Sequence, residues 1–453
     1  MAGLALVARE AGFEVSGCDQ AVYPPMSNLL RAEGIAVQDG YHPDSLTVSP
    51  SLCVIGNALS RGNPLIEHIL TQRWPYTSGP QWLREKIIPH KRMLAVAGTH
   101  GKTTASSIAA FILDQCGHQP GFLIGGVPGN FSVSARLGQG EWFVIEADEY
   151  DTAFFDKRPK FLHYRPDVLV LGNLEFDHAD IFDNLGDIEQ QFEFLLRSVP
   201  SDGVILVNAD HAGLSDLVAR GCWSQIVTYS CANANASWRA VTLQADYRRF
   251  DVFFEDRYVA TVDWSLIGQH NMANALGAIA ACQAAGAEPA AACASLAAFQ
   301  PPKRRLERIN PSSPIALFDD FAHHPTAVRE TLRSLQAPET KGSLIAILEP
   351  RSNTMKRGVH RADLAQALSI ADTAIIRRRN DLDWDPEELT QSTDGAKITV
   401  CDSIAEIVDT VCDMAKPGDR IVMMSNGSFD GLGDLLDARL DRHKHLSRGN
   451  FDE

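Results

Sequence analysis

The sequence predicts an α/β protein that is divided into three domains. Apolar runs with the length of buried strands alternate with helical patterns along most of the chain. A chain of 453 residues also exceeds what one hydrophobic core comfortably holds, so two or three domains are expected. A polar, basic stretch at 84–92 and the adjacent prolines Pro301 and Pro302, which break any helix, mark the linkers. The expected domains are residues 1–88, 89–300 and 301–453.

Each domain has a pattern of its own. The first 88 residues alternate strand and helix patterns around short apolar runs. In the second domain the segment from Trp238 to Trp264 alternates as antiparallel strands do, so a small antiparallel sheet should accompany the parallel one. The last domain alternates again and predicts a second nucleotide-fold-like α/β unit. Its expected strands lie at 315–318, 343–348, 373–376 and 420–424.

Composition narrows the class of protein. With 45% hydrophobic and 22% charged residues, the chain is typical of soluble globular proteins. It contains no apolar run near the ~20 residues that span a bilayer and no secretion leader. Nine singly scattered cysteines indicate reduced thiols in a cytoplasm and neither a disulfide framework nor a cysteine zinc site. A net charge of −16 argues against nucleic acid as a partner, and no obligate protein partner is evident.

A glycine-bearing loop between an expected strand and an expected helix is typical of phosphate binding. The apolar run 93–96 precedes it, and a helical pattern comes after it. Backbone N–H groups and the helix N-terminus would meet the phosphates, with the lysine on their outer oxygens. The loop is a shortened variant, because Val96 stands where the general pattern has its first glycine. Its members are Gly98, Thr99, His100, Gly101, Lys102, Thr103 and Thr104.

Two acidic segments come after further apolar runs. The run 142–145 ends in Glu146, and the run 168–172 leads into Asn173, Glu175 and His178. Either segment alone is typical of a solvated strand-end loop. Ligands of open parallel sheets gather beyond the carboxyl ends of strands, so the lysine loop and both acidic tips should converge. Their joint placement favours a phosphoryl-transfer site.

These motifs resemble the ATP-dependent Mur ligases of bacterial cell-wall synthesis. The matching segments keep the family's order and cover nearly the whole chain; they lie at 98–104, 146–149, 173–178, 270–274, 304–305 and 319–325. The resemblance implies Rossmann-like first and third domains around a central P-loop ATPase-like domain. Within the family, segments 57–64, 125–130, 153–158 and 349–355 are similar to the subgroup that joins UDP-N-acetylmuramate to L-alanyl-γ-D-glutamyl-meso-diaminopimelate, a tripeptide salvaged from old wall.

The resemblance implies that ATP and Mg²⁺ activate the sugar carboxylate as an acyl phosphate, which the peptide amine then attacks. The implied catalytic residues are Lys102, Glu146, His178 and Arg305, and the implied Mg²⁺ ligands are Thr103, Glu146 and His178. The implied nucleotide contacts beyond the loop are Asn271, Asn274, Arg305 and Asp320. The implied substrate contacts are Asn57, Asn63, Asn173, Glu175, His324, Arg351, Ser352 and Asn353.

Structural roles compete with several of these assignments. His178 also suits a capping histidine near a strand end, and Asn271 also suits an N-cap of the alanine-rich helix. The basic run at 303–305 also suits a solvated turn. Arg351 suits a peptide carboxylate, because its guanidinium binds carboxylates through two parallel hydrogen bonds, but a structural ion pair is an equal alternative.

Two other functions and one departure stay open. The chain could be the ligase that adds L-alanine, or a nucleotide-binding regulator or transport ATPase that uses the loop as a switch. Arg305 and the second α/β domain argue against the regulator.

Members of the family open with a strand and a glycine-rich turn for the UDP diphosphate, whereas residues 1–5 resemble the segment just after that turn. We therefore expect the first strand to be missing, as a misplaced start codon would cause.

Overall fold

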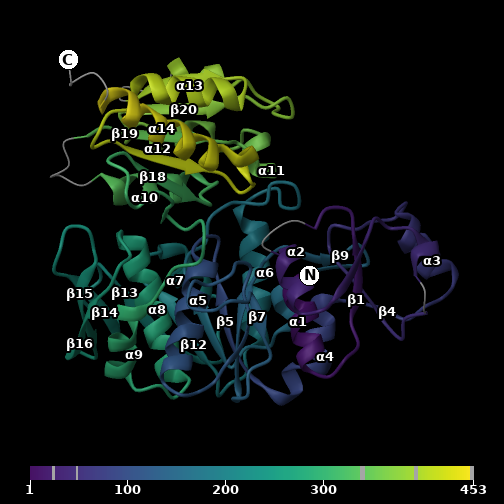
Figure 1. Cartoon of the computed structure of the whole chain (residues 1–453). Helices are drawn as coiled ribbons and strands as arrows, with labels where there is room; N and C mark the ends of the chain where they lie inside the picture. The colour runs from purple at the N-terminus through teal and green to yellow at the C-terminus, as the bar shows by residue number, and fades with distance from the viewer. Residues whose placement is uncertain (23–25, 47–48, 337–341, 392–395, 449–453) are drawn as a thin grey trace.

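The computed structural model describes residues 1–22, 26–46, 49–336, 342–391 and 396–448 and has three parts (Figure 1). A central unit is built on a ten-stranded sheet, a C-terminal unit on a six-stranded sheet, and an N-terminal part on two short strand pairs. Alternation of strands and helices runs through all three, as the sequence predicts. The C-terminal unit lies above the central unit in Figure 1, with the N-terminal part at the right.

The central sheet is parallel in its middle and antiparallel at both edges. From edge to edge its strands are β16 (Arg257–Asp263), β15 (Arg249–Phe254), β14 (Trp238–Thr242), β13 (Gln225–Ser230), β12 (Val204–Asn208), β11 (Val168–Leu171), β5 (Arg92–Ala97), β8 (Trp142–Ala147), β6 (Gly121–Leu123) and β7 (Ala135–Arg136). The predicted antiparallel strands β14–β16 continue the parallel sheet, because β14 pairs alongside β13.

Strand β5 is buried on both faces, which explains its continuous apolar sequence. Leu94 and Val96 belong to one core, whereas Met93 and Ala95 belong to the core on the opposite face. Helices α5 (Lys102–Gln115), α8 (Gln269–Ala284) and α9 (Pro289–Ser295) contribute to the first core. Helices α1 (Ala2–Glu10), α4 (Gly79–Lys86), α6 (Leu185–Ser198) and α7 (Ala212–Ala219) contribute to the second.

The C-terminal unit repeats this three-layer plan on a smaller scale. Its strand order is β17 (Glu307–Arg308), β18 (Ala316–Asp320), β22 (Arg420–Met424), β19 (Leu344–Leu348), β20 (Thr373–Arg377) and β21 (Lys397–Cys401), and only β17 is antiparallel to its neighbour. Helices α10 (Pro325–Leu335) and α12 (Arg361–Leu368) contribute to the core on one face, and α13 (Ile404–Met414) and α14 (Leu432–Arg448) to the other. The short helix α11 (Asn353–Lys356) comes after β19.

The N-terminal part has two separate parallel pairs. They are β1 (Ser16–Asp19) with β2 (Ala36–Asp39) and β3 (Cys53–Ile55) with β4 (Tyr76–Ser78), accompanied by α2 (Met26–Ala32) and α3 (Pro64–Thr71). A small antiparallel pair, β9 (Asp151–Ala153) with β10 (Asp156–Pro159), comes after β8. Within the described residues, no helix is both long and apolar enough to cross a membrane.

The sheet extension at β14 gives a direct test of the core. Trp238 is fully buried and stacks on Phe254 with ring centroids 4.6 Å apart. Replacing it by alanine leaves a large cavity, so Trp238→Ala should lower the free energy of unfolding by about 3–5 kcal/mol. Trp223, whose side chain is 63% exposed, provides the control, and Trp223→Ala should change stability by no more than about 0.5 kcal/mol. Equal losses in urea denaturation of the two variants would contradict this core assignment.

Candidate active site

The carboxyl ends of three neighbouring strands lie side by side in the middle of the central sheet. Strand β5 pairs with β11 on one side and with β8 on the other, and all three run parallel. Their carboxyl ends therefore carry neighbouring loops, as expected for ligand sites in open parallel sheets. The loop after β5 holds the glycine-lysine motif, and the loops after β8 and β11 hold the acidic segments. The structure brings these motifs together, as the sequence predicts.

Glycine is required at two places in the phosphate loop. Gly98 and Gly101 have φ angles of 148° and 78°, which disfavour residues with a Cβ atom. A Cβ at Gly101 would also lie 2.7 Å from Oδ1 of Asn274. Helix α5 begins directly after Gly101, so its first N–H groups and Lys102 face the same space. This is the arrangement that binds phosphate.

Lys102 lies in a buried charge network with Glu149 and His178. Its Nζ lies 2.6 Å from the carbonyl of Gly98 and 3.1 Å from Glu149 Oε2. The other Glu149 oxygen lies 3.4 Å from His178 Nε2. Burial alone would lower the pKa of Lys102, but Glu149 and the nearby Asp148 outweigh it and raise the pKa. Lys102 therefore stays cationic, as a phosphate-binding lysine must.

His178 is held in a conformation that non-glycine residues rarely adopt. Its φ of 54° is left-handed, and its N–H donates to the side chain of Asp177 at 2.7 Å. Burial would lower the pKa of its ring, but the contact with Glu149 and the charge of Asp177 raise the pKa instead. Such strain at an ion-paired histidine is typical of a functional position.

Glu146 and Thr103 form an oxygen donor pair beside this network. Glu146 accepts a hydrogen bond from Gly125 N at 2.7 Å and pairs with the Thr103 hydroxyl. Burial raises the pKa of Glu146 above its ordinary value despite the nearby Arg305. A carboxylate and a hydroxyl next to a phosphate loop are donors that Mg²⁺ prefers, so these two residues fit the metal. Arg305 also reaches Thr103 Oγ1 at 3.1 Å.

The remaining predicted nucleotide residues surround the loop in different ways. Asn274 lies against Gly101, whereas Asn271 turns back to bond the carbonyl of Ile267 at 2.8 Å. Asp320 is buried and accepts from the backbone N–H of Leu306 at 2.6 Å, which fixes the turn that carries Arg305. Asn271 and Asp320 thus have structural partners already, and their predicted nucleotide contacts stay predictions.

The 173–180 loop after β11 joins the central unit to the C-terminal unit. Asp177 accepts from the Thr354 hydroxyl at 2.6 Å, and Asp180 accepts from the Asn353 amide at 2.9 Å. The carbonyl of Phe176 lies 3.2 Å from His324 Nε2 and 2.9 Å from His360 Nε2. Asn173 instead faces the phosphate loop, where its side chain accepts from His100 N at 2.8 Å.

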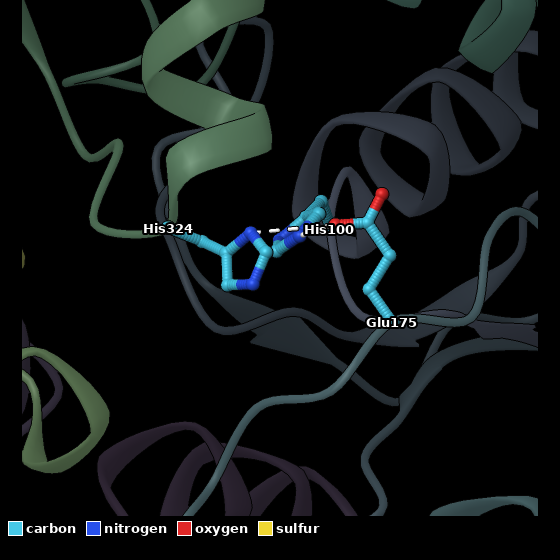
Figure 2. A group of neighbouring side chains, drawn as sticks. All are labelled: His100, Glu175 and His324. Atoms are coloured by element: carbon cyan, nitrogen blue, oxygen red, sulfur yellow. Dashed lines mark hydrogen bonds and ion pairs between the residues drawn. The ribbon is translucent and has the colours of Figure 1, made fainter. Parts of the chain in front are cut away.

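A second cluster of ionisable groups crosses the same boundary. Figure 2 shows His100, Glu175 and His324 converging, with His324 at the start of helix α10. Glu175 Oε2 lies 3.3 Å from His100 Nε2 and 3.4 Å from His324 Nδ1. The imidazole centroids of His100 and His324 are 4.3 Å apart. Two predicted substrate residues and one loop residue thus form a compact interdomain group.

A cleft of about 250 Å³ opens between the two units. Its lining residues are Tyr150, Asp177, His178, Asp180, His323, Arg351, Ser352, Asn353, Thr354, Lys356 and Asn426. Arg351 is partly exposed there, 4.0 Å from the buried Glu349. A Cβ added to Gly427 would lie 2.3 Å from the Arg351 guanidinium, so glycine leaves the space that this side chain occupies. The cleft therefore holds the Arg351 guanidinium together with His178 of the charge network.

Some predicted residues lie elsewhere, and some functional candidates were not predicted. Asn63 caps helix α3, accepting from Leu65 N at 3.1 Å, and Asn57 is exposed; neither lines the cleft. Ser352 lines the cleft but also caps helix α11. Sequence patterns assigned no separate role to Glu149 or His323, although both belong to motifs that those patterns singled out. Their buried contacts become visible only once the strands are paired.

The comparisons with known proteins agree with this geometry. Residues 1–90, 96–282 and 304–427 match, in order, the Mur ligase family catalytic domain, the Mur ligase middle domain and the Mur ligase glutamate ligase domain. The UDP-N-acetylmuramate–L-alanyl-γ-D-glutamyl-meso-2,6-diaminoheptandioate ligase of Escherichia coli is 47% identical over 442 residues, which are 96% of this chain and 95% of that protein.

Two further proteins are similar to this chain over nearly its whole length. The crystal structure of a murein peptide ligase from Psychrobacter arcticus is 42% identical with a TM-score of 0.75, covering 97% of this chain and 96% of that one. The UDP-N-acetylmuramate–L-alanine ligase of Streptomyces avermitilis is 30% identical over 458 residues, 98% of this chain and 95% of that protein.

The chain therefore belongs to the Mur ligase family, whose members are ATP-dependent ligases that form carbon–nitrogen bonds. The predicted family, ligase activity and three-part α/β architecture are confirmed. The boundaries after residues 88 and 300 stay predictions. Family membership also argues against a regulator or transport ATPase as the function.

The buried His324 should make stability depend on pH. Burial, together with the neighbouring His100, lowers its pKa from 6.5 to about 3. Below pH 6.5 the unfolded chain binds a proton at this histidine and the folded chain does not. The free energy of unfolding therefore decreases as the pH is lowered from 6.5 to about 3. One such group contributes a slope of up to about 1.4 kcal/mol per pH unit.

His324→Asn removes this titration but keeps a side-chain acceptor at the N-cap of α10. The variant should lose free energy of unfolding less steeply than the wild type between pH 6.5 and 4.5, as measured in urea. Parallel pH profiles for the two proteins would show that His324 is not held neutral by the fold.

Proposed function

We propose that this ligase joins the lactyl carboxylate of UDP-N-acetylmuramate to the free amine of L-alanyl-γ-D-glutamyl-meso-diaminopimelate. The observation that carries the proposal is the cleft between the units, whose lining includes both Arg351 and His178, the outer member of the Lys102–Glu149–His178 network. Arg351 in this cleft suits a peptide carboxylate. The 47% identity to the Escherichia coli enzyme, against 30% to the alanine ligase, supports the same substrate.

The chain's own residues would each hold a different part of the substrates. Lys102 and the first N–H groups of α5 would hold the β- and γ-phosphates of ATP. Thr103 and Glu146 would hold Mg²⁺, and His178 with Glu149 would hold a second ion near the acceptor carboxylate. Bound there, such ions would neutralise the charge of the transferred phosphoryl group. Arg305, which the C-terminal unit places at Thr103, would meet the γ-phosphate when the units close.

Peptide-bond formation then needs positioning more than acid–base chemistry. The γ-phosphate passes to the carboxylate oxygen, ADP leaves, and the amine attacks the carbonyl carbon while phosphate departs. The cleft would hold the amine near that carbonyl and exclude water, which otherwise hydrolyses the acyl phosphate. Residues 1–88 would bind the UDP moiety, and the enzyme would act in the cytoplasm, where both nucleotide substrates are made.

An ATP turnover assay tests the proposal. The full chain with Mg²⁺, UDP-N-acetylmuramate and tripeptide should release ADP and form the UDP-linked tripeptide, as mass spectrometry would detect. Leaving out either substrate should reduce ADP release to background. Faster turnover with L-alanine than with the tripeptide would make it an alanine-adding ligase. ADP release that neither substrate stimulates would contradict the ligase assignment itself.

Loss of either charged group in the phosphate site should abolish most of the activity. One preorganised charge contact typically supplies ~10²–10³ in rate, so Lys102→Ala and Glu146→Ala should each reduce kcat by at least that factor. Lys157, an exposed lysine paired with Asp151, provides the control, and Lys157→Ala should keep normal turnover. Near-normal kcat in either site variant, with the fold checked by circular dichroism, would overturn its role.

Displacing Arg351 without removing it should weaken peptide binding selectively. The methyl group of Gly427→Ala would push the guanidinium aside, because the added Cβ lies 2.3 Å from it. Losing one charge-assisted hydrogen bond costs about 1.5–3 kcal/mol, so the KM for tripeptide should rise about 10–100-fold while the KM for ATP stays unchanged. Gly213 has open space around it, and Gly213→Ala should change neither constant. Equal rises in both KM values would indicate a general distortion of the cleft.

A further inference from the structure

We propose that His100, Glu175 and His324 form a binding site for a Zn²⁺-like divalent ion that bridges the central and C-terminal units. The site is separate from the Mg²⁺ positions inferred above, although the resemblance also assigns Glu175 and His324 to substrate contacts. His100 and Glu175 come after β5 and β11 of the central sheet, whereas His324 begins helix α10 on the C-terminal sheet. An ion held by all three would bind only when the units are together.

The distances within the cluster match those between ligands of one tetrahedral ion. With metal–ligand bonds of about 2.0–2.2 Å, neighbouring donor atoms in a tetrahedron are separated by about 3.3–3.6 Å. Glu175 Oε2 lies 3.3 Å from His100 Nε2 and 3.4 Å from His324 Nδ1. All three donor atoms lie within 4.8 Å of one another, so small rotations of the rings suffice. Three protein ligands leave a fourth position for water.

The groups around the cluster fix its donors. Nε2 of His324 lies 3.2 Å from the carbonyl of Phe176, and a hydrogen bond there leaves Nδ1 unprotonated toward Glu175. Metal-binding histidines usually donate their second ring N–H in this manner. The hydroxyl of Thr326 donates to Glu175 at 2.6 Å. The N–H of Thr326 donates to His324 Nδ1 at 3.3 Å, and a metal bound at Nδ1 would replace this capping hydrogen bond. The backbone of His100 is bonded to the Asn173 side chain on both its N–H and C=O.

The chemistry of the three donors indicates which ion the cluster would take. Two further imidazoles, those of His360 and His211, surround the group. Two nitrogen donors and one carboxylate favour Zn²⁺ and its neighbours over Mg²⁺, which prefers oxygen.

The experiment measures metal binding by the full chain after chelator treatment. Co²⁺ serves as a spectroscopic probe, and Zn²⁺ affinity is measured in competition with a chromogenic chelator. The variants are His324→Asn and Glu175→Gln, which keep the capping acceptor and the hydrogen-bonding shape. His178→Ala is the control, since it removes a ligand from the other candidate group of Asp148, Glu149 and His178.

Wild type and His178→Ala should bind Zn²⁺ with equal affinity. Bound Co²⁺ should show the visible absorption bands of a tetrahedral site and no charge-transfer absorption from a cysteine thiolate. His324→Asn and Glu175→Gln should weaken binding by at least about 10–100-fold, the loss that even an outer partner of a metal ligand causes. Wild-type affinity in His324→Asn, loss of binding in His178→Ala, or a thiolate band from the free cysteines would each overturn the proposal.

Hydrogen exchange tests whether the ion bridges the units. In the wild type, Zn²⁺ should slow amide exchange both in the 98–101 loop of the central unit and in the first turn of α10. In His324→Asn, neither segment should respond at the same Zn²⁺ concentration. Protection confined to one of the two segments in the wild type would overturn the bridging arrangement.

Discussion

The 173–180 loop after β11 is the element on which both the site and the arrangement of the units depend. One side of it touches the phosphate loop through Asn173, and the other side bonds the C-terminal unit through Asp177 and Asp180. The same backbone holds His178 in its left-handed conformation against Glu149. A change in this loop would therefore alter the phosphate loop, the His178–Glu149 contact and the junction between the units together. Strand β11 can hold it rigidly because β11 is central in the sheet and buried on both faces.

The charges of the site are balanced within the protein. Lys102 is paired with Glu149, and Asp148 with Lys160 at 2.6 Å, while Glu175 accepts a hydrogen bond from the Thr326 hydroxyl at 2.6 Å. An unpaired buried charge would be costly, so each of these groups needs a partner in the absence of ligands. Phosphates and cations would take over some of these partnerships, exchanging one set of ion pairs for another. That exchange allows strongly charged substrates to enter a buried site without a large desolvation penalty.

Sequence patterns predicted those features that local chemistry dictates. The apolar runs of β5, β8 and β11, the turn at Gly101 and the acidic segments all depend on a few consecutive residues, and their convergence results from the rule for parallel sheets. The pairing of Lys102 with Glu149 could not be predicted in the same way, because Glu146 and Glu149 lie at the end of the same strand and only the folded loop distinguishes them. The position of His324 depends on how two units dock, which no local pattern encodes.

Opening the units must break the bonds of the 173–180 loop as a set. Several of them involve ionised groups, among them Thr354 with Asp177, Asn353 with Asp180, and Thr326 with Glu175. Each hydrogen bond contributes about 0.5–1.5 kcal/mol net, and those to charged groups about twice that. They share one loop, so a separation of the two units would break them together. Because Asp177, Asp180 and His178 also line the cleft, a substrate bound there would contact the same loop that joins the two units. The residues that line the cleft are therefore partly the residues that hold the units together.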